Sequence, residues 1–457
     1  MKNSHSINAK RIVIALVFEI EYKIKRDLMK NGKKDTNELK NISLRLHKKY
    51  TGKIQTIGKM KIGYEDLKIY YTPGVAYPCL EISRKPESSY DYTNRGNSVA
   101  IVTNGTRILG LGKIGPEAGM PVMEGKALLM KKFGALDAVP LAINAQTEDE
   151  IVDFVKKIAP SFGIVNIEDI EMPLSLKVVR RLRKEADIPI FYDDSDGTGI
   201  VARAALINAA KLVKKDIKKM RIVINGTGAA GIGIANLLLS SGINNIVMCD
   251  TAGIIYKGRK ENMNEFKIEI SEKTNPKLQK GSLEDAAEGA DALIGVSTKD
   301  AFSKQLIQKM NKDAIVFALA NPFPEINYYE AKKAGAAIVA TGRSDFPNQI
   351  NNFIAFPGAL RGLLETRSDK INNDILIAAS DALADLALEA VQRNDTERII
   401  PKFDSESATI KITTMVATEV ARAAIKTGAG KKKVLPSEIG KKIKKLFSNY
   451  RKIEGIL

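Results

Sequence analysis

Two pairs of neighbouring carboxylates are the most chemically suggestive feature of the sequence. Glu168 with Asp169, and Asp193 with Asp194, each come directly after a short apolar run that is typical of a buried strand. Strand ends that deliver acidic side chains to one place form an all-oxygen site, which suits Mg²⁺ or Mn²⁺. Each pair taken alone is more often a helix cap or a solvated turn, so the spacing by itself leaves both interpretations open.

A glycine-rich segment is the second candidate site. It lies between an expected strand at 221–225 and an expected helix at 230–239, and it consists of Gly226, Thr227, Gly228, Ala229, Ala230 and Gly231. Glycines permit a tight turn and let backbone amides approach a pyrophosphate, whose charge a helix N-terminus stabilises. The segment therefore predicts a dinucleotide site.

The type of dinucleotide depends on Asp250, which ends the next apolar segment about 20 residues after Gly231. A carboxylate at this spacing binds the ribose hydroxyls and would repel a 2′-phosphate, so Asp250 favours NAD. Lys257 and Arg259 follow closely and could offer that phosphate a counter-charge, which keeps NADP open as the alternative.

A tyrosine and a lysine are candidate acid–base groups. Tyr71 begins the segment Tyr-Thr-Pro-Gly-Val, and Lys126 ends the segment Pro-Val-Met-Glu-Gly-Lys. Tyrosine and lysine side chains have pKa values near 10 in solution, so each can act as a general acid or base if burial and neighbouring charges tune it. A single tyrosine on a turn or a single lysine in a helix is usually structural.

The elements that must position these residues follow from the hydrophobic pattern. Short apolar runs separated by Gly and Pro predict a mixed α/β domain over about 60–200. A helix at 200–213 then leads into alternating strands and helices, which is typical of a parallel sheet built from βαβ units. The expected strands are 221–225, 245–250, 291–297, 314–318 and 336–340, and the segments 374–392 and 407–426 are expected to be helical.

Composition excludes several other classes of protein. The chain has 457 residues, of which 44% are hydrophobic and 27% charged, as in a globular protein of two or three domains. No apolar run approaches the roughly 20 residues that span a bilayer, and the stretch 12–18 lacks a signal-peptide cleavage site. We expect a cytoplasmic protein without membrane contact.

The rare residues exclude further chemistry. Cys79 and Cys249 are expected to be small core residues, and His5 and His47 have no partner at ligand spacing, which argues against hydrolase triads and histidine metal sites. The net charge of +18 invites a nucleic-acid interpretation. The basic runs are dispersed and lack aromatic residues for stacking, so we expect solvated helix faces and no nucleic-acid partner.

Taken together, the motifs resemble those of the malic enzyme family over about residues 66–430. The resembling segments are Tyr-Thr-Pro-Gly-Val-Ala (71–76), Leu-Gly-Leu-Gly (109–112), Pro-Val-Met-Glu-Gly-Lys (121–126), Asn-Ile-Glu-Asp-Ile (166–170), Asp-Asp (193–194), Leu-Ala-Asn-Pro (319–322) and Asn-Gln-Ile-Asn-Asn (348–352). The resemblance implies a homodimer that converts malate to pyruvate and CO₂ with a divalent metal, Mg²⁺ or Mn²⁺, and NAD or NADP.

The resemblance also implies roles for individual residues. Lys126 would remove the C2 hydroxyl proton with Asp193 beside it, and Tyr71 would protonate C3 of the enolate. The implied metal ligands are Glu168, Asp169 and Asp194; the implied malate contacts are Lys126, Asn321, Asn352 and Arg107; and Thr198 and Ser297 would join the cofactor residues. For Arg107 a plain surface role is nearly as well supported.

The implied fold is α/β: an N-terminal mixed α/β substrate domain, a Rossmann-like doubly wound parallel-sheet domain, and C-terminal helices. The expected boundaries are 1–55 for an N-terminal extension, 56–199 for the malate- and metal-binding domain, 200–372 for the NAD(P)-binding domain and 373–457 for the helical segment.

Three residues depart from the family pattern: Ser195, Asp196 and Gly199, where relatives usually carry a glutamine or another residue, a histidine and an alanine. An impaired enzyme, or one that only decarboxylates oxaloacetate, is therefore the first alternative. An amino-acid or shikimate-type dehydrogenase would not need a metal, and a basic nucleic-acid-binding protein is a remote third interpretation.

Overall fold

The computed structural model describes residues 36–60 and 62–454, and the chain divides into two compact units, Met1–Gln55 and Thr56–Leu457. In the first unit the described residues, 36–55, include helix α2 (Thr36–Tyr50), which carries the partly buried His47. His5 and the apolar stretch 12–18 lie outside the described residues. Within the described residues, no helix combines the length and the apolar character that crossing a membrane requires.

The second unit begins with short helices and then forms a four-stranded parallel sheet, in the order β2-β1-β3-β4. The strands are β1 (Ser98–Thr103), β2 (Asp137–Ala142), β3 (Ile164–Ile167) and β4 (Ile190–Tyr192). The helices are α3 (Leu67–Tyr70), α4 (Ala76–Arg84), α5 (Ser89–Tyr92), α6 (Pro116–Gly134), α7 (Glu148–Ile158) and α8 (Leu174–Glu185), with short turns η1 (Tyr64–Asp66), η2 (Pro86–Ser88), η3 (Asn94–Asn97) and η4 (Ala159–Ser161). All six residues of β1 are buried, as expected for a parallel strand covered on both faces.

A second sheet of six strands follows, in the order β10-β9-β8-β5-β6-β7. Its strands are β5 (Ile222–Asn225), β6 (Ile246–Asp250), β7 (Gly253–Ile254), β8 (Ala292–Gly295), β9 (Ile315–Ala318) and β10 (Ile338–Thr341), and only the pair β6–β7 is antiparallel. Its helices are α9 (Thr198–Leu212), α10 (Ala229–Ser240), α11 (Glu265–Ser271), α12 (Leu283–Ala287), α13 (Lys304–Gln308) and α14 (Tyr328–Lys333). The predicted α/β fold class with a Rossmann-like sheet is confirmed.

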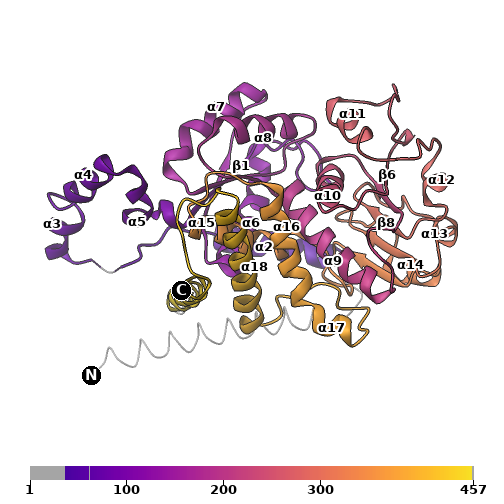
Figure 1. Ribbon diagram of the computed structural model, residues 1–457. Helices are drawn as coiled ribbons and strands as arrows, with labels where there is room; N and C mark the ends of the chain where they lie inside the picture. The colour runs from indigo at the N-terminus through magenta and orange to yellow at the C-terminus, as the bar shows by residue number, and fades with distance from the viewer. Residues whose placement is uncertain (1–35, 61, 455–457) are drawn as a thin grey trace. The chain divides into compact units, whose positions relative to one another are not determined.

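The C-terminal part is helical: η6 (Asn352–Ile354), α15 (Phe356–Glu365), α16 (Asn373–Leu386), α17 (Leu388–Gln392), α18 (Glu406–Lys426) and α19 (Pro436–Glu454). The segment 374–392, predicted as one helix, is interrupted at Ala387, which separates α16 from α17. Helices α9, α16 and α18 lie side by side (Figure 1).

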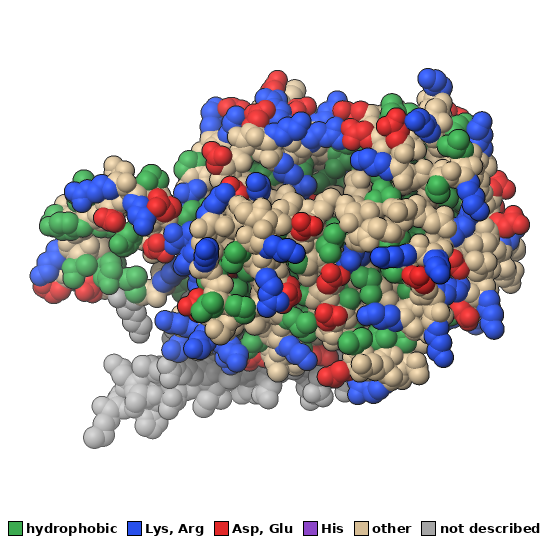
Figure 2. Space-filling view, in the orientation of Figure 1, with side chains coloured by type: hydrophobic (Ala, Val, Ile, Leu, Met, Phe, Trp, Pro, Cys, Tyr) green, Lys and Arg blue, Asp and Glu red, His purple; other side chains and the backbone are tan. Residues whose placement is uncertain are grey.

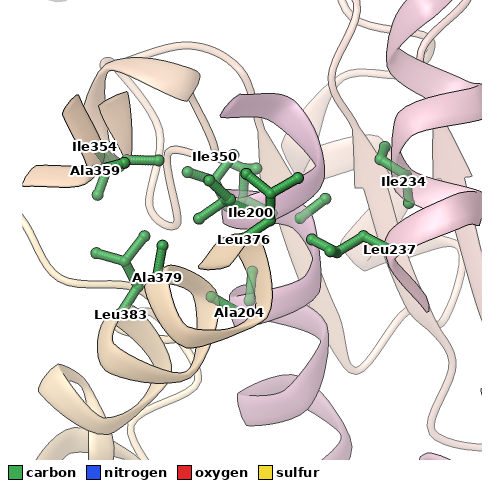
Figure 3. Close-up of a cluster of buried hydrophobic side chains, with 14 of the residues drawn as sticks. Ile200, Ala204, Ile234, Leu237, Ile350, Ile354, Ala359, Leu376, Ala379 and Leu383 are labelled. Atoms are coloured by element: carbon green, nitrogen blue, oxygen red, sulfur yellow. The ribbon is translucent and has the colours of Figure 1, made fainter. Parts of the chain in front are cut away.

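One apolar core joins both sheets to the C-terminal helices. Figure 3 shows part of it, with Ile200 of α9 and Leu376 of α16 close together in the view and Leu237 of α10 to their right. Because α9 links the two sheets and is buried on nearly all sides, it fixes the first sheet relative to the second.

Two surface features bear on the sequence-based expectations. Lys and Arg side chains are spread among Asp and Glu side chains over the face seen in Figure 2, in agreement with solvated helix faces. Cys249 is buried in β6, but Cys79 is exposed on α4, so its assignment to the core was wrong. Short α4 has no buried residue, and a small apolar side chain by itself does not determine burial.

Candidate active site

The two carboxylate pairs meet at one edge of the first sheet. Strands β3 and β4 are parallel neighbours, with Ile167 paired to Tyr192, so both chains leave the sheet at the same end. One carboxylate oxygen from each of Glu168, Asp169 and Asp194 lies within 4.8 Å of the others. The structure thus brings together the three residues that were predicted as metal ligands.

The backbone around these carboxylates is held in uncommon conformations. Asp169 has a φ of 50°, in the left-handed region, and Asp193–Gly197 form a wide five-residue helical turn, η5. A side chain at Gly197 would place a Cβ only 2.0 Å from an oxygen of Asp193, so the turn requires glycine there. The backbone N–H of Asp169 donates to Asp194 Oδ2 at 3.1 Å. Conformations of this kind cluster at functional sites.

Lys126, from helix α6, reaches into the same cluster. Its ammonium donates to Glu168 Oε1 at 2.5 Å and also to Asp193, and it lies 5.0 Å from the ring centre of Phe356. The side chain is only 9% exposed, and the amide of Asn166 donates to the second oxygen of Glu168 at 2.8 Å. Lys126 and Asp193, predicted to act together, are therefore in direct contact.

Burial and mutual repulsion control the charges of the cluster. Burial, followed by the charges of Glu168 and Asp194, raises the pKa of Asp169 to about 8. Burial and Glu168 raise the pKa of Asp194 to about 6, and burial raises the pKa of Asp193 to about 8 although Lys126 opposes this. Since crowded carboxylates resist ionisation without a counter-charge, the cluster suits a hard divalent cation.

For Lys126 the balance is different. Burial by itself would lower the pKa of its ammonium, but Asp193 and Glu168 together raise that pKa above its usual value. The lysine is therefore a proton donor as long as both carboxylates face it. One oxygen of Asp193, Oδ1, is buried and has no hydrogen-bond partner among the described residues, so the site retains an unused acceptor next to Lys126.

The glycine-rich segment joins β5 to α10, in the predicted place. Gly226 has a φ of 118°, and a Cβ there would lie 2.5 Å from the carbonyl oxygen of Val296. A Cβ on Gly231 would lie 1.8 Å from the carbonyl oxygen of Gly226, so the turn can close only around glycine. Helix α10 begins at Ala229, which points its free backbone amides at the turn. This geometry fits a pyrophosphate.

Asp250 ends β6 but is already engaged. Arg259 donates to it at 2.5 Å, Lys267 at 2.7 Å and the amide of Asn262 at 3.1 Å. Burial would raise the pKa of this carboxyl group, but the two cations lower it below its usual value. The end of β6 therefore carries two positive charges against one negative charge; the sequence had indicated Arg259 as a counter-charge but not Lys267.

The remaining predicted residues lie at the edges of both sites. The backbone N–H of Arg107 donates to the carbonyl oxygen of Asp169 at 3.1 Å, and a Cβ on Gly228 would lie 3.3 Å from Arg107 Nη1. The side chain of Arg107 thus extends from the carboxylate cluster to the glycine-rich turn. Asn352 packs beside turn η5, since a Cβ on Gly197 would lie 3.1 Å from its Cβ.

Three other predicted site residues each follow a strand or turn η5. Asn321 follows β9 closely and is exposed, with its amide against Gly342. Ser297 follows β8, and its hydroxyl accepts a hydrogen bond from Asn225 at 2.9 Å. Thr198 begins α9 directly after turn η5. All three follow an element that ends at a candidate site.

Comparison with known proteins agrees with this arrangement. The model of the malic enzyme NAD-binding domain matches residues 195–425, and that of the malic enzyme N-terminal domain matches residues 51–152. The chain belongs to the malic enzyme family. A bifunctional malic/malolactic enzyme from Bacillus subtilis is 47% identical over 410 residues, which are 89% of this chain and 98% of that protein.

Other members of the malic enzyme family match comparably. An NAD-dependent malic enzyme from Geobacillus stearothermophilus is 43% identical and covers 84% of this chain and 79% of its own length. The malic enzyme from Pyrococcus horikoshii superposes with a TM-score of 0.86 at 42% identity, covering 91% of this chain and 97% of its own. Relatives named NADP-dependent malic enzymes also match, so the family membership does not decide between the two cofactors.

Tyr71 is a predicted site residue that lies on the surface of the single chain. Its side chain is 70% exposed, between α3 and α4, and it makes no hydrogen bond, ion pair or ring contact among the described residues. It lies in a surface rich in exposed apolar side chains, which we call the apolar lobe: Ile62, Tyr64, Leu67, Ile69, Tyr70, Tyr71, Val75, Tyr77, Leu80 and Tyr92. Figure 2 shows such side chains gathered over α3 and α4.

Three participants had no assigned role from the sequence. Asn166 supports Glu168, Phe356 lies beside Lys126, and Lys267 neutralises Asp250. Asn166 could have been found, because residues two apart on a strand share a face. Phe356 and Lys267 come from segments whose neighbours only the folded chain determines.

Proposed function

We propose that the chain oxidises and decarboxylates L-malate to pyruvate and CO₂, with reduction of NAD or NADP and with Mg²⁺ or Mn²⁺. The observation that carries the proposal is the buried contact of Lys126 with Glu168 and Asp193, at the sheet edge where three carboxylates gather. The names of the relatives support the same reaction.

The metal would be held by Glu168, Asp169 and Asp194. When bound, a divalent cation supplies Lewis-acid stabilisation of the charge that develops on the substrate oxygens. The residues fit such an ion, because they are hard oxygen ligands that lie within 4.8 Å of one another. Burial, followed by the charge of Glu168, raises the pKa values of Asp169 and Asp194.

Lys126 would take the proton of the C2 hydroxyl of malate, and a bound nicotinamide would supply the hydride acceptor. Two carboxylates, Glu168 and Asp193, keep its ammonium protonated. The lysine would therefore act as a base only when Glu168 binds the metal ion instead of contacting Lys126. Asp193 then remains as its single partner and keeps the amine oriented. Arg107, Asn352 and Asn321 are proposed to bind malate.

The glycine-rich segment, with Thr198 and Ser297, is proposed to bind the dinucleotide, and both cofactors are proposed to be accepted. Asp250 can still bind ribose hydroxyls, which favours NAD. Its ion pairs with Arg259 and Lys267 leave an excess positive charge at the end of β6, so a 2′-phosphate is not repelled there.

Tyr71 is proposed to protonate C3 of the enolate, delivered by a second copy of the chain. Within the described residues of one chain its hydroxyl is exposed and has no hydrogen-bond partner, whereas the reaction needs an acid next to the cluster of Lys126. The apolar lobe around Tyr71 groups many exposed apolar side chains in one segment of the chain. Isolated exposed apolar residues are common on monomers, but a group of this kind is typical of a surface that docks on another protein. A homodimer would cover the lobe and complete the site.

The function is tested by following cofactor reduction with L-malate, Mn²⁺ and NAD or NADP. We expect pyruvate and reduced cofactor in equal amounts, no reaction with EDTA, and a loss of at least about 100-fold in kcat for Lys126→Ala. Lys132→Ala, on the exposed side of the same helix, should retain the activity of the unaltered protein. Decarboxylation of oxaloacetate without any oxidation of malate would favour the oxaloacetate decarboxylase instead.

A further inference from the structure

A cavity of about 440 Å³ lies behind turn η5, among helices α9, α10 and α16. Its walls are Arg183, Ser195, Asp196, Gly199, Gly233, Asn236, Leu237, Leu239, Ser240, Lys273, Asn373 and Leu376. Leu237 and Leu376 form part of the apolar wall and lie on either side of α9 in Figure 3. This volume is within the range of sites that hold small organic molecules.

The cavity is separate from the proposed malate and dinucleotide sites. None of the proposed metal ligands, and no residue of the glycine-rich segment, lines it. It shares only turn η5 with the active site: Asp193 and Asp194 belong to the carboxylate cluster, while Ser195 and Asp196 face the cavity. A molecule bound here would contact turn η5 through Ser195 and Asp196.

The three departures from the family motif, Ser195, Asp196 and Gly199, all line this cavity. At Gly199 even a Cβ would lie 3.2 Å from the carbonyl oxygen of Gly233, so an alanine there would narrow the space. The departures therefore leave the proposed metal ligands unchanged and alter one wall of the cavity instead.

The polar lining offers more hydrogen-bond donors than the protein uses. Arg183 donates through Nε and Nη2 to the carbonyl of Ile190 and through Nη2 to Asp196, which leaves Nη1 without a partner among the described residues. The side chains of Lys273 and Asn236 make no ion pair or hydrogen bond within the described part of the chain.

The charge of the lining is positive. Asp196 is the one carboxylate among the described residues that line the wall, and Arg183 already pairs with it. The ammonium of Lys273 has no ion pair within the described part of the chain. A ligand with an oxyanion group would pair with Lys273 and Arg183 Nη1, and a short organic body would cover the leucine wall.

We propose that this cavity binds a small organic anion through its carboxylate or phosphate oxygens, at a site distinct from that of malate. The proposal does not depend on the proposed catalytic function, because it concerns binding to the full chain in the absence of malate, cofactor and metal.

Isothermal titration of the purified full chain tests the proposal, with citrate and glycerol 2-phosphate as probes and sodium chloride of equal ionic strength as the blank. We expect at least one probe to bind saturably with a Kd of about 1 mM or tighter. Lys273→Ala should weaken binding by about tenfold. Asn236→Leu, which replaces the amide by an apolar group in the wall, should abolish it.

Lys277→Ala is the matched control, because Lys277 is an exposed lysine four residues further on that does not line the cavity. The Lys277→Ala variant should bind the probes with the affinity of the unaltered chain. All three variants should have the melting temperature of the unaltered chain. Absence of saturable binding of both probes overturns the proposal. The proposal is also overturned if Lys273→Ala and Asn236→Leu both bind the probe with the affinity of the unaltered chain, since the anion would then bind elsewhere.

Discussion

Protons and a divalent cation should compete for Asp169 and Asp194, two of the three proposed metal ligands, so the affinity for Mn²⁺ should rise steeply with pH. The pKa of Asp169 is raised to about 8 and that of Asp194 to about 6, chiefly by burial. A carboxylate binds a metal ion only when it is ionised, so each proton must leave first.

The size of the effect follows from these two pKa values. Between pH 8 and pH 6, the ionised fraction of Asp169 falls by about 50-fold and that of Asp194 by about twofold. The apparent affinity for Mn²⁺ should therefore fall by about 100-fold over this range. Isothermal titration of the protein with MnCl₂ under nitrogen, without malate or cofactor, measures it directly.

The same carboxylates should affect the stability of the metal-free protein. An acid whose pKa is higher in the folded than in the unfolded chain binds more protons when folded, so stability is lost as pH rises from about 4 to about 8. The melting temperature of the metal-free protein should fall as the pH rises over this range. The increase in melting temperature that Mn²⁺ causes should become larger over the same range.

Two variants separate this mechanism from a general effect of pH. Asp169→Asn should reduce the pH dependence of Mn²⁺ affinity to about twofold, because Asp194 is then the one of these two metal ligands that still titrates in this range. Asp196→Asn should keep the full pH dependence of Mn²⁺ affinity. One oxygen of Asp196 accepts both of its hydrogen bonds, so the amide oxygen of asparagine can take the place of that oxygen. A change of less than about threefold in the unaltered protein would refute the reasoning.

Two further predictions concern the second copy and the cofactor. Mixing inactive Tyr71→Phe and Lys126→Ala chains should restore activity, up to about a quarter of the sites, if Tyr71 comes from the partner chain; no recovery after subunit exchange would place the acid within one chain. Lys267→Ala should raise the KM for NADP relative to NAD by about tenfold, while Lys260→Ala, an exposed neighbour, should leave the ratio unchanged. An unchanged ratio for Lys267→Ala would exclude it as a 2′-phosphate contact.

The sequence determined most of the local structure around the site. Acidic pairs directly after apolar runs marked the ends of β3 and β4, and the glycines between β5 and α10 marked a turn that tolerates no side chain at Gly231. These features were predictable because strand burial, helix starts and glycine turns depend on residues close together in the chain.

Only the tertiary structure decided which of these parts meet. That β3 and β4 are neighbours, that Lys126 from α6 reaches both, and that Asp250 is neutralised by Lys267 depend on contacts between segments far apart or across a loop. Local pattern specifies the type of an element but not its partners, because partners are selected by the packing of the whole core. For the same reason the sequence placed Tyr71 beside Lys126, whereas the single folded chain leaves it exposed in the apolar lobe.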